Sequence, residues 1–155
     1  MTDVLISLDT NILFYAADMR DAEKHRAALA LMKRVLAAGP AVVIAGQVLC
    51  ELYASLTRKR ILLPADALLL VQQYERTFER LPVAVDAFRR AFDAVAAHGL
   101  QIWDAVLWAN SDAYGCKYLV SEDFQDGRRL GGVTFLNPFT ADGRLLLDAA
   151  LPPMD

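Results

Sequence analysis

Residues 118–132, "YLVSEDFQDGRRLGG", join a short apolar run to three acids within five positions. Such a run, followed at once by polar residues, is typical of a buried strand that ends in a loop. Glu122, Asp123 and Asp126 therefore follow the end of an expected strand. Carboxylates that gather at one strand end repel each other, so the stretch raises the question of what neutralises them.

Similar apolar runs alternate with helical segments along the chain. The runs lack polar alternation, which is typical of parallel strands covered on both faces. The predicted strands are residues 4–8, 41–44, 117–120 and 133–137, with a brief one at 82–85. The predicted helices are residues 10–18, 21–39, 46–60, 64–81, 86–99 and 102–115. The pattern predicts one α/β domain over residues 1–155, with a short, mainly parallel sheet of four to five strands flanked by helices on both faces.

The composition fits a globular domain, since the 155 residues are 55% hydrophobic and 23% charged. No uncharged apolar run approaches the ~20 residues of a membrane span. The first residues carry acids where a signal peptide has a basic region, so we expect no signal peptide and a cytoplasmic protein. The net charge of −3 does not suggest nucleic-acid binding, although local basic patches are compatible with it.

The two cysteines, Cys50 and Cys116, are too few for a disulfide framework. Their apolar neighbours predict buried, reduced thiols. Together with His25 and His98 they also lack the ligand spacing of a zinc site.

Three further acids have unusual positions. Asp9 directly follows the strand at 4–8, and the carboxyl ends of parallel strands meet at the same edge of a sheet. We therefore expect Asp9 to lie near the acids at 122–126. Glu51 and Asp104 lie on predicted helices among apolar neighbours, with no basic residue within a helical turn. Acids are rarely buried unless they are paired, so both suggest a site.

Each acid also has an ordinary structural explanation. Asp9 and Asp104 can cap helices, Glu51 can reach solvent along its stem, and Asp123 and Asp126 can form turns. These separate roles do not explain why so many carboxylates without basic partners occupy strand ends and apolar faces. Converging carboxylates require a cation, and an all-oxygen site suits Mg²⁺ or Mn²⁺.

Four blocks of sequence, in order and over nearly the whole chain, resemble one known family. They are "LISLDTNILFYAAD" (5–18), the glutamate of "QVLCELYASL" (47–56), the aspartate of "IWDAVLWA" (102–109) and "YLVSEDFQDGR" (118–128). Together they resemble the PIN-domain nucleases, and among these the VapC-type toxins of toxin–antitoxin pairs. The resemblance implies a PIN-like three-layer fold and a Mg²⁺- or Mn²⁺-dependent ribonuclease. It also implies a homodimer that a small cognate antitoxin inhibits.

The family's four acids fall on Asp9, Glu51, Asp104 and Asp123 of this sequence. The resemblance implies that these residues are catalytic and bind the metal. The chemistry of phosphodiester hydrolysis supports the same set, because a metal site must activate water and stabilise the leaving oxygen. We expect Asp9, Asp104 and Asp123 to hold the metal, and Glu51 to orient the attacking water or to hold a second ion.

Other candidate residues surround these acids. Asn11 and Ser121 match polar positions that support the family's site, and Asp126 is a further supporting residue at a position that varies in the family. The candidates for binding RNA phosphates are Arg58, Lys59, Arg60, Arg128 and Arg129. The run at 58–60 is equally explained as favourable charge at a helix C-terminus. For the dimer, the apolar surfaces of the helices at 21–38 and 64–81 are candidate interfaces.

Rival functions fit the residues less well. A haloacid-dehalogenase-like phosphatase needs a second acid where this chain has Asn11, and a receiver domain needs a lysine after a late strand, whereas Lys117 precedes its strand. A ribonuclease with two catalytic histidines would need His25 and His98, which lie on helices expected to be peripheral. The alternatives left open are a catalytically silent PIN-like RNA-binding or interaction module and a phosphatase-like hydrolase on a similar α/β fold.

Overall fold

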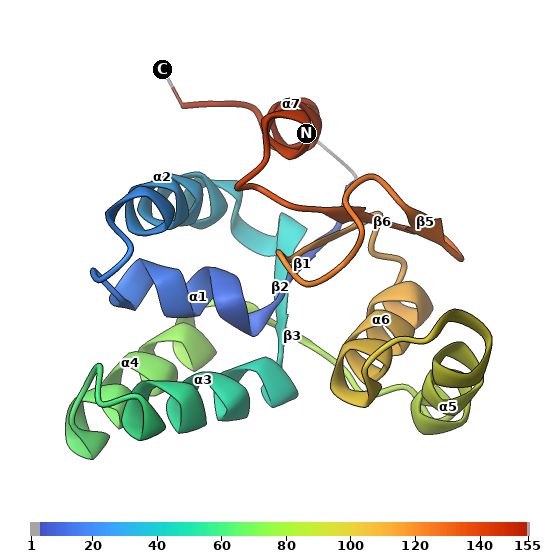
Figure 1. Cartoon of the computed structure of the whole chain (residues 1–155), viewed down its shortest axis with the longest axis horizontal. Helices are drawn as coiled ribbons and strands as arrows, with labels where there is room; N and C mark the ends of the chain where they lie inside the picture. The colour runs from blue at the N-terminus through green and yellow to red at the C-terminus, as the bar shows by residue number, and fades with distance from the viewer. Residues whose placement is uncertain (1–3, 155) are drawn as a thin grey trace.

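The computed structural model describes residues 4–154, in which strands and helices alternate (Figure 1). The strands are β1 (Ile6–Leu8), β2 (Val42–Ala45), β3 (Glu79–Leu81), β4 (Tyr118–Val120), β5 (Arg129–Leu130) and β6 (Val133–Leu136). The helices are α1 (Thr10–Ala17), α2 (Ala22–Ala38), α3 (Gly46–Arg58), α4 (Pro64–Thr77), α5 (Ala87–His98), α6 (Ile102–Tyr114) and α7 (Ala141–Ala150). A 3₁₀ turn, η1 (Gly39–Ala41), leads from α2 into β2.

The strands form one sheet in the order β3-β2-β1-β4-β6-β5. Neighbouring strands are parallel except β5, which is antiparallel to β6. Helices α1 to α4 lie on one side of the sheet, and α5 and α6 lie on the other (Figure 1). This is the predicted fold class, although the sheet has six strands instead of four to five.

The order of the strands reverses at β1. The chain first moves outward from β1 to β2 and β3, and then returns to place β4 on the free side of β1. In open α/β sheets, ligands bind at such a reversal, outside the carboxyl ends of the two central strands. The topology therefore predicts a ligand site at the loops after β1 and β4.

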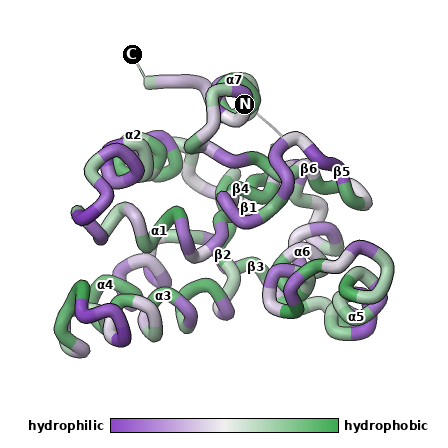
Figure 2. Tube along the Cα trace, viewed as in Figure 1, coloured by the Kyte–Doolittle hydropathy of each residue, from purple (hydrophilic) through white to green (hydrophobic). Residues whose placement is uncertain are grey.

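The core follows from the apolar composition of the strands and of α6. Every residue of β1 and β2 is buried, and so are the residues of α6 from Ala105 to Ser111. Hydrophobic segments gather around the central strands, whereas the helices mix hydrophilic and hydrophobic residues, with hydrophobic ones also on the outer sides of α4 and α5 (Figure 2). The expected central helix at 102–115 is thus confirmed, but Trp103 and Tyr114, near its two ends, are exposed.

The predicted boundary between the helix at 64–81 and the strand at 82–85 is wrong. Helix α4 ends at Thr77, and β3 occupies Glu79–Leu81. Pro82 explains the shift, because proline has no N–H for a strand ladder and favours extended backbone in the preceding residue. The strand therefore lies before the proline, at the edge of the sheet, with Glu79 and Arg80 exposed.

Two elements lie outside the predicted set. Strand β5 pairs with β6 through a two-residue turn at Gly131 and Gly132, the kind of turn that a glycine pair favours. Helix α7 starts after Thr140, whose hydroxyl accepts a hydrogen bond from the Gly143 N–H at 2.9 Å.

The cysteine prediction is half right. Both thiols are free, and Cys116 is buried directly after α6, but Cys50 is exposed on α3. Within residues 4–154, none of the helices combines the length and the hydrophobicity that a membrane span requires.

Candidate active site

Three aspartates meet where the strand order reverses. Asp9 follows β1, Asp123 follows β4, and Asp104 lies in the first turn of α6. One carboxylate oxygen from each residue lies within 4.8 Å of those of the other two. We call these residues the aspartate cluster. Their convergence agrees with the sequence-based expectation that acids from separate elements meet at one edge of the sheet.

Asp9 is the most buried member, with 4% of its surface exposed. Its Oδ1 accepts a hydrogen bond from the Thr10 N–H at 2.7 Å, so Asp9 also caps α1. Its Oδ2 accepts one from the Ser121 hydroxyl at 2.7 Å. Burial raises the pKa of Asp9 from 3.8 to about 6, and the charges of Asp123 and Glu51 act in the same direction, against the two hydrogen bonds.

Asp104 does not cap its helix. The cap of α6 is Gln101, whose Oε1 accepts hydrogen bonds from the N–H groups of Trp103 at 2.9 Å and Asp104 at 3.1 Å. Among residues 4–154, no group donates a hydrogen bond to the Asp104 carboxylate. Burial, followed by the charges of Asp9, Asp123 and Glu51, raises the pKa of Asp104 to about 7. Its position is thus unfavourable for a carboxylate without a cation.

Neutral side chains hold the cluster together. The Asn11 amide nitrogen lies 3.4 Å from Asp9 Oδ2, 3.0 Å from Ser121 Oγ and 3.1 Å from Asp123 Oδ2. Ser121 Oγ also accepts a hydrogen bond from the Asp123 N–H at 3.1 Å. The next residue, Phe124, stacks on Phe135 of β6 with ring centroids 4.1 Å apart, which fixes the loop. Asn11 and Ser121 therefore lie in the supporting positions that the sequence suggested.

Glu51 lies beside the aspartate cluster but outside the group of three converging oxygens. Its Oε2 accepts a hydrogen bond from the Thr10 hydroxyl at 3.0 Å, and its Oε1 accepts one from Gln47 Nε2 at 2.8 Å. The same Gln47 nitrogen donates to the Trp103 carbonyl at 2.9 Å. Thr10 and Gln47 were not among the expected site residues. The i, i+4 spacing of Gln47 and Glu51 on one helix was a usable signal for the second.

The three acids of residues 118–132, namely Glu122, Asp123 and Asp126, accept hydrogen bonds from different partners. Glu122 accepts hydrogen bonds from Lys24 Nζ at 2.8 Å and from the Tyr15 hydroxyl at 2.7 Å. Asp126 accepts them from the Asn137 N–H at 2.9 Å and the Thr140 hydroxyl at 2.6 Å, so it steadies the turn into α7 and not the cluster. Only Asp123 joins the cluster. Glu122 and Asp126 thus each accept two hydrogen bonds from groups outside the cluster.

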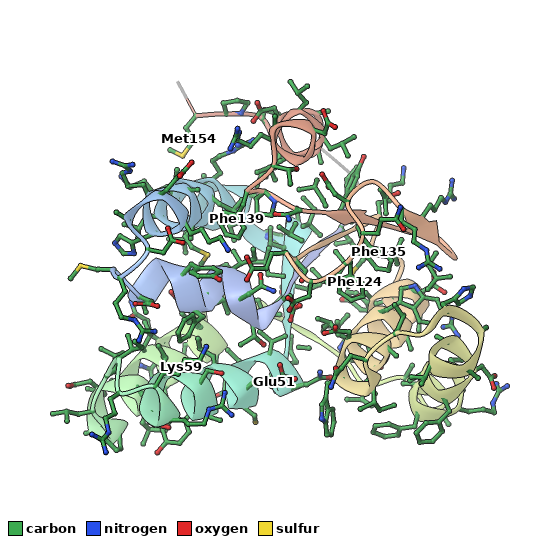
Figure 3. All side chains as sticks on the ribbon, viewed as in Figure 1. Glu51, Lys59, Phe124, Phe135, Phe139 and Met154 are labelled. Carbon is green, nitrogen blue, oxygen red and sulfur yellow. The ribbon has the colours of Figure 1, made fainter. Side chains whose placement is uncertain are left out.

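Within the described residues, none of the basic candidates forms an ion pair with an acid of the site. Arg58 is the last residue of α3 and Lys59 and Arg60 follow it, whereas Glu51 lies nearer to the middle of that helix (Figure 3). Lys59 Nζ lies 4.7 Å from the centre of the Phe14 ring. Arg128 and Arg129 lie at the start of the β5–β6 hairpin, and Arg129 Nε donates to the Gly131 carbonyl at 3.2 Å.

The donor set fits a hard divalent cation. In the described part of the chain, ion pairs form at six acids, and none of these acids is Asp9, Glu51, Asp104 or Asp123. The side chains that donate hydrogen bonds to Asp9, Glu51 and Asp123 are neutral, so they orient the carboxylate oxygens without cancelling their charge. Carboxylate oxygens gathered in this way are the ligands that Mg²⁺ and Mn²⁺ prefer.

Comparison with known proteins gives one family. The model of the PIN domain family matches residues 6–128, a range that includes the aspartate cluster, Glu51, Asn11 and Ser121. No curated protein matches the sequence.

Solved structures with the same fold include three bacterial toxin proteins or complexes. VapC20 of Mycobacterium tuberculosis, a sarcin-ricin loop cleaving toxin, is 21% identical over 74% of this chain and 86% of its own, with a TM-score of 0.58. A toxin–antitoxin complex from Klebsiella pneumoniae gives 20% identity, 86% and 97% coverage and a TM-score of 0.60. VapBC2 of Rickettsia felis, bound to a DNA fragment from its promoter, is 14% identical over 85% of this chain and 97% of its own, with a TM-score of 0.61.

Proposed function

This chain belongs to the PIN domain family, and on that premise we propose that it is a metal-dependent endoribonuclease that acts as the toxin of a toxin–antitoxin pair. The observation that carries the proposal is the aspartate cluster, whose three carboxylates converge within 4.8 Å without a cationic partner in the described part of the chain. A structural cluster of acids would be expected to contain a lysine or an arginine, because unpaired buried charge is costly.

The residues divide the chemistry between them. Asp9, Asp104 and Asp123 would hold the ion, and Asn11 and Ser121 would fix the directions of their oxygens. A bound Mg²⁺ or Mn²⁺ would polarise the phosphodiester, lower the pKa of water and stabilise the leaving oxygen. Glu51 is fixed by Thr10 and Gln47 beside the cluster, which suits a carboxylate that orients the attacking water and takes its proton, or that binds a second ion.

The assignment as a toxin rests on similarity. A neighbour of the same fold cleaves the sarcin-ricin loop, and two others are toxin–antitoxin assemblies. We propose RNA as the substrate, a cytoplasmic location and a small cognate antitoxin as inhibitor. An antitoxin that places an arginine or lysine against the cluster would neutralise these acids as a metal does. The candidate phosphate contacts remain Arg58, Lys59 and Arg60 at the end of α3, and Arg128 and Arg129 at the start of the β5–β6 hairpin.

We also propose a homodimer. Leu68 and Leu69 of α4 and Leu36 of α2 are large apolar side chains that are 48%, 62% and 53% exposed. Burying such side chains against a second copy would remove apolar surface from water. Light scattering at micromolar concentration is expected to give twice the mass of the chain, and a monomer would contradict this part of the proposal.

A cleavage assay on total RNA tests the enzymatic proposal. The wild type, Asp9→Asn and the control Asp112→Asn are incubated with Mg²⁺, with Mn²⁺ or with EDTA. We expect cleavage by the wild type and the control only when metal is present, and none by Asp9→Asn. RNA binding without cleavage by the wild type would favour the alternative of a silent RNA-binding module. Hydrolysis of phosphomonoesters alone would favour the phosphatase-like alternative.

A further inference from the structure

A pocket of about 330 Å³ opens beside the aspartate cluster. It lies where the start of α3, the end of β3 and the helices α5 and α6 come together, and its walls are mostly apolar. The residues that line it include Arg80, Pro82, Phe88, Trp103, Val106 and Asn110. A cavity of this size and character is large enough for one planar ring system.

The pocket and the proposed catalytic acids share a wall. Trp103 lines the pocket and directly precedes Asp104 on α6. Gln47, which also lines the pocket, donates hydrogen bonds both to Glu51 and to the Trp103 carbonyl. A group bound in the pocket would therefore lie next to any phosphate held at the cluster.

Two aromatic side chains that line the pocket, one on α6 and one on α5, are unusually open to solvent. Trp103 is 54% exposed and Phe88 is 52% exposed. The hydrogen bonds that join Trp103 to the side chains of Gln47 and Gln101 use its backbone, so the indole ring is not needed to hold the α6 N-terminus. Exposed aromatic rings that line a pocket can act as stacking surfaces for the bases of single-stranded nucleic acid.

The pocket also contains polar groups without partners. Asn110 is 4% exposed, and its Oδ1 accepts a hydrogen bond from the Ala84 N–H at 2.8 Å. Within residues 4–154, no acceptor pairs with the Nδ2 group of this amide, and this nitrogen is not fully buried, so a ligand in the pocket can reach it. The Gln47 Oε1 atom is buried and likewise has no donor there. A nucleobase edge carries acceptors as well as donors, so it can accept a hydrogen bond from the Asn110 Nδ2 group.

We propose that this pocket binds a nucleobase of single-stranded RNA adjacent to the scissile phosphate. The base would stack on Trp103, with its edge toward Asn110, while Arg80 at the rim is placed near the backbone of the strand. The position relative to the scissile phosphate rests on the proposed ribonuclease function. The binding of the base does not, and it is tested separately.

The binding test uses the fluorescence of Trp103 under conditions without turnover. The chain has two tryptophans, and Trp108 is only 7% exposed, so quenching from solution reports mainly on Trp103. In EDTA, the wild type and Trp103→Phe are titrated with oligouridylate, oligoadenylate and an abasic ribose-phosphate oligomer of equal length. We expect quenching of the wild type by the oligomers that carry bases, and none in Trp103→Phe. Equal quenching by the abasic oligomer, or none at all, would overturn the proposal.

The second test measures cleavage of the same base-bearing oligomers with Mn²⁺. Loss of one base–aromatic stack predicts that Trp103→Ala lowers kcat/KM roughly tenfold or more, mainly through KM, while Trp103→Phe keeps most activity. Tyr114→Ala is the matched control, because Tyr114 is 41% exposed at the other end of the same helix. Wild-type cleavage that Trp103→Ala leaves unchanged would contradict the proposal. If the wild type cleaves nothing, the ribonuclease function fails, and the fluorescence titration alone decides whether the pocket binds bases.

Discussion

Helix α6 carries two aspartates, eight positions apart, whose surroundings are opposite. Asp112 pairs with Arg90 of α5, and its Oδ1 accepts a hydrogen bond from the Gly132 N–H at 2.8 Å. Asp104 accepts no hydrogen bond within the described residues and faces Asp9, Asp123 and Glu51, whose charges raise its pKa further than burial alone does. The protein neutralises one carboxylate and leaves the other without compensation.

The difference separates a structural acid, Asp112, from the acid that we propose to be functional, Asp104. Asp112 ties three elements together, because it bridges α5 to α6 and holds the β5–β6 hairpin against them. The hairpin approaches so closely that a Cβ at Gly131 would lie 2.9 Å from Asp112 Oδ1. Asp104 ties nothing together. A residue that costs stability and has no structural partner is best explained by a ligand.

The largest expected effect concerns catalysis. Asp104→Asn keeps the size of the side chain but removes its charge, so we expect metal-dependent RNA cleavage to fall by about a hundredfold or more. Asp112→Asn is expected to stay within a few-fold of the wild type. Initial cleavage rates at matched Mn²⁺ concentrations measure both, and similar losses in the two variants would remove the distinction between the two aspartates.

Stability should respond in the opposite way. Asp112→Ala leaves Arg90 without its partner and the Gly132 N–H without its acceptor, so the free energy of unfolding should fall by about 1–3 kcal/mol. Asp104→Ala removes a repulsive charge and should cost less in EDTA, or even stabilise the fold. Urea unfolding of both variants without metal measures these changes. A larger fall in the free energy of unfolding for Asp104→Ala than for Asp112→Ala would contradict this prediction.

The metal-free protein should lose stability as the pH rises. Asp9 and Asp104 have folded pKa values of about 6 and about 7, above their ordinary 3.8, so between these values the folded state binds more protons than the unfolded state. The free energy of unfolding must then decrease from about pH 4 to about pH 7, here by roughly 1–2 kcal/mol after allowance for solvent screening. Melts in EDTA at pH 5 and pH 8 should show this decrease in the wild type. It should be smaller in Asp104→Asn, and identical pH dependence in the two proteins would argue against the cluster.

The smallest effect is expected at the neighbouring loop. Glu122→Gln weakens the ion pair with Lys24, whose two side chains are 21% and 35% exposed, and should cost ~0.2–1 kcal/mol. Because Glu122 lies outside the aspartate cluster, the gain in stability that Mn²⁺ gives should not change. A variant that loses this gain would show that Glu122 contributes to the metal site.

The sequence was sufficient to predict that Asp9 and Asp123 meet, because both follow apolar runs that become adjacent parallel strands. The fate of Glu122 could not be predicted in the same way. Its partner Lys24 lies 98 residues away, on a helix whose rotation about its axis depends on packing. Asp126 looked like a site residue for the same reason, since nothing local reveals its bonds to Asn137 and Thr140.

The boundaries of some helices and strands were likewise hard to predict from the sequence. The apolar periodicity of α4 runs on past Thr77, and only the pairing of β3 with β2 decides that Glu79–Leu81 are extended. Pro82 was a local signal for this boundary. The Gly131–Gly132 pair and the capping Thr140 were also readable signals, for the β5–β6 hairpin and for α7.

Mn²⁺-dependent thermal melts of the wild type, Asp104→Asn and Asp112→Asn test the central claim most directly. A true site stabilises the folded protein by about 2.7 kcal/mol at a hundredfold excess of metal over its Kd. We predict this gain, relative to EDTA, for the wild type and for Asp112→Asn, even though the latter melts at a lower temperature throughout. We predict that Asp104→Asn loses most of it. If the wild type and Asp104→Asn respond identically across the Mn²⁺ series, Asp104 is not a ligand, and the aspartate cluster is not the metal centre.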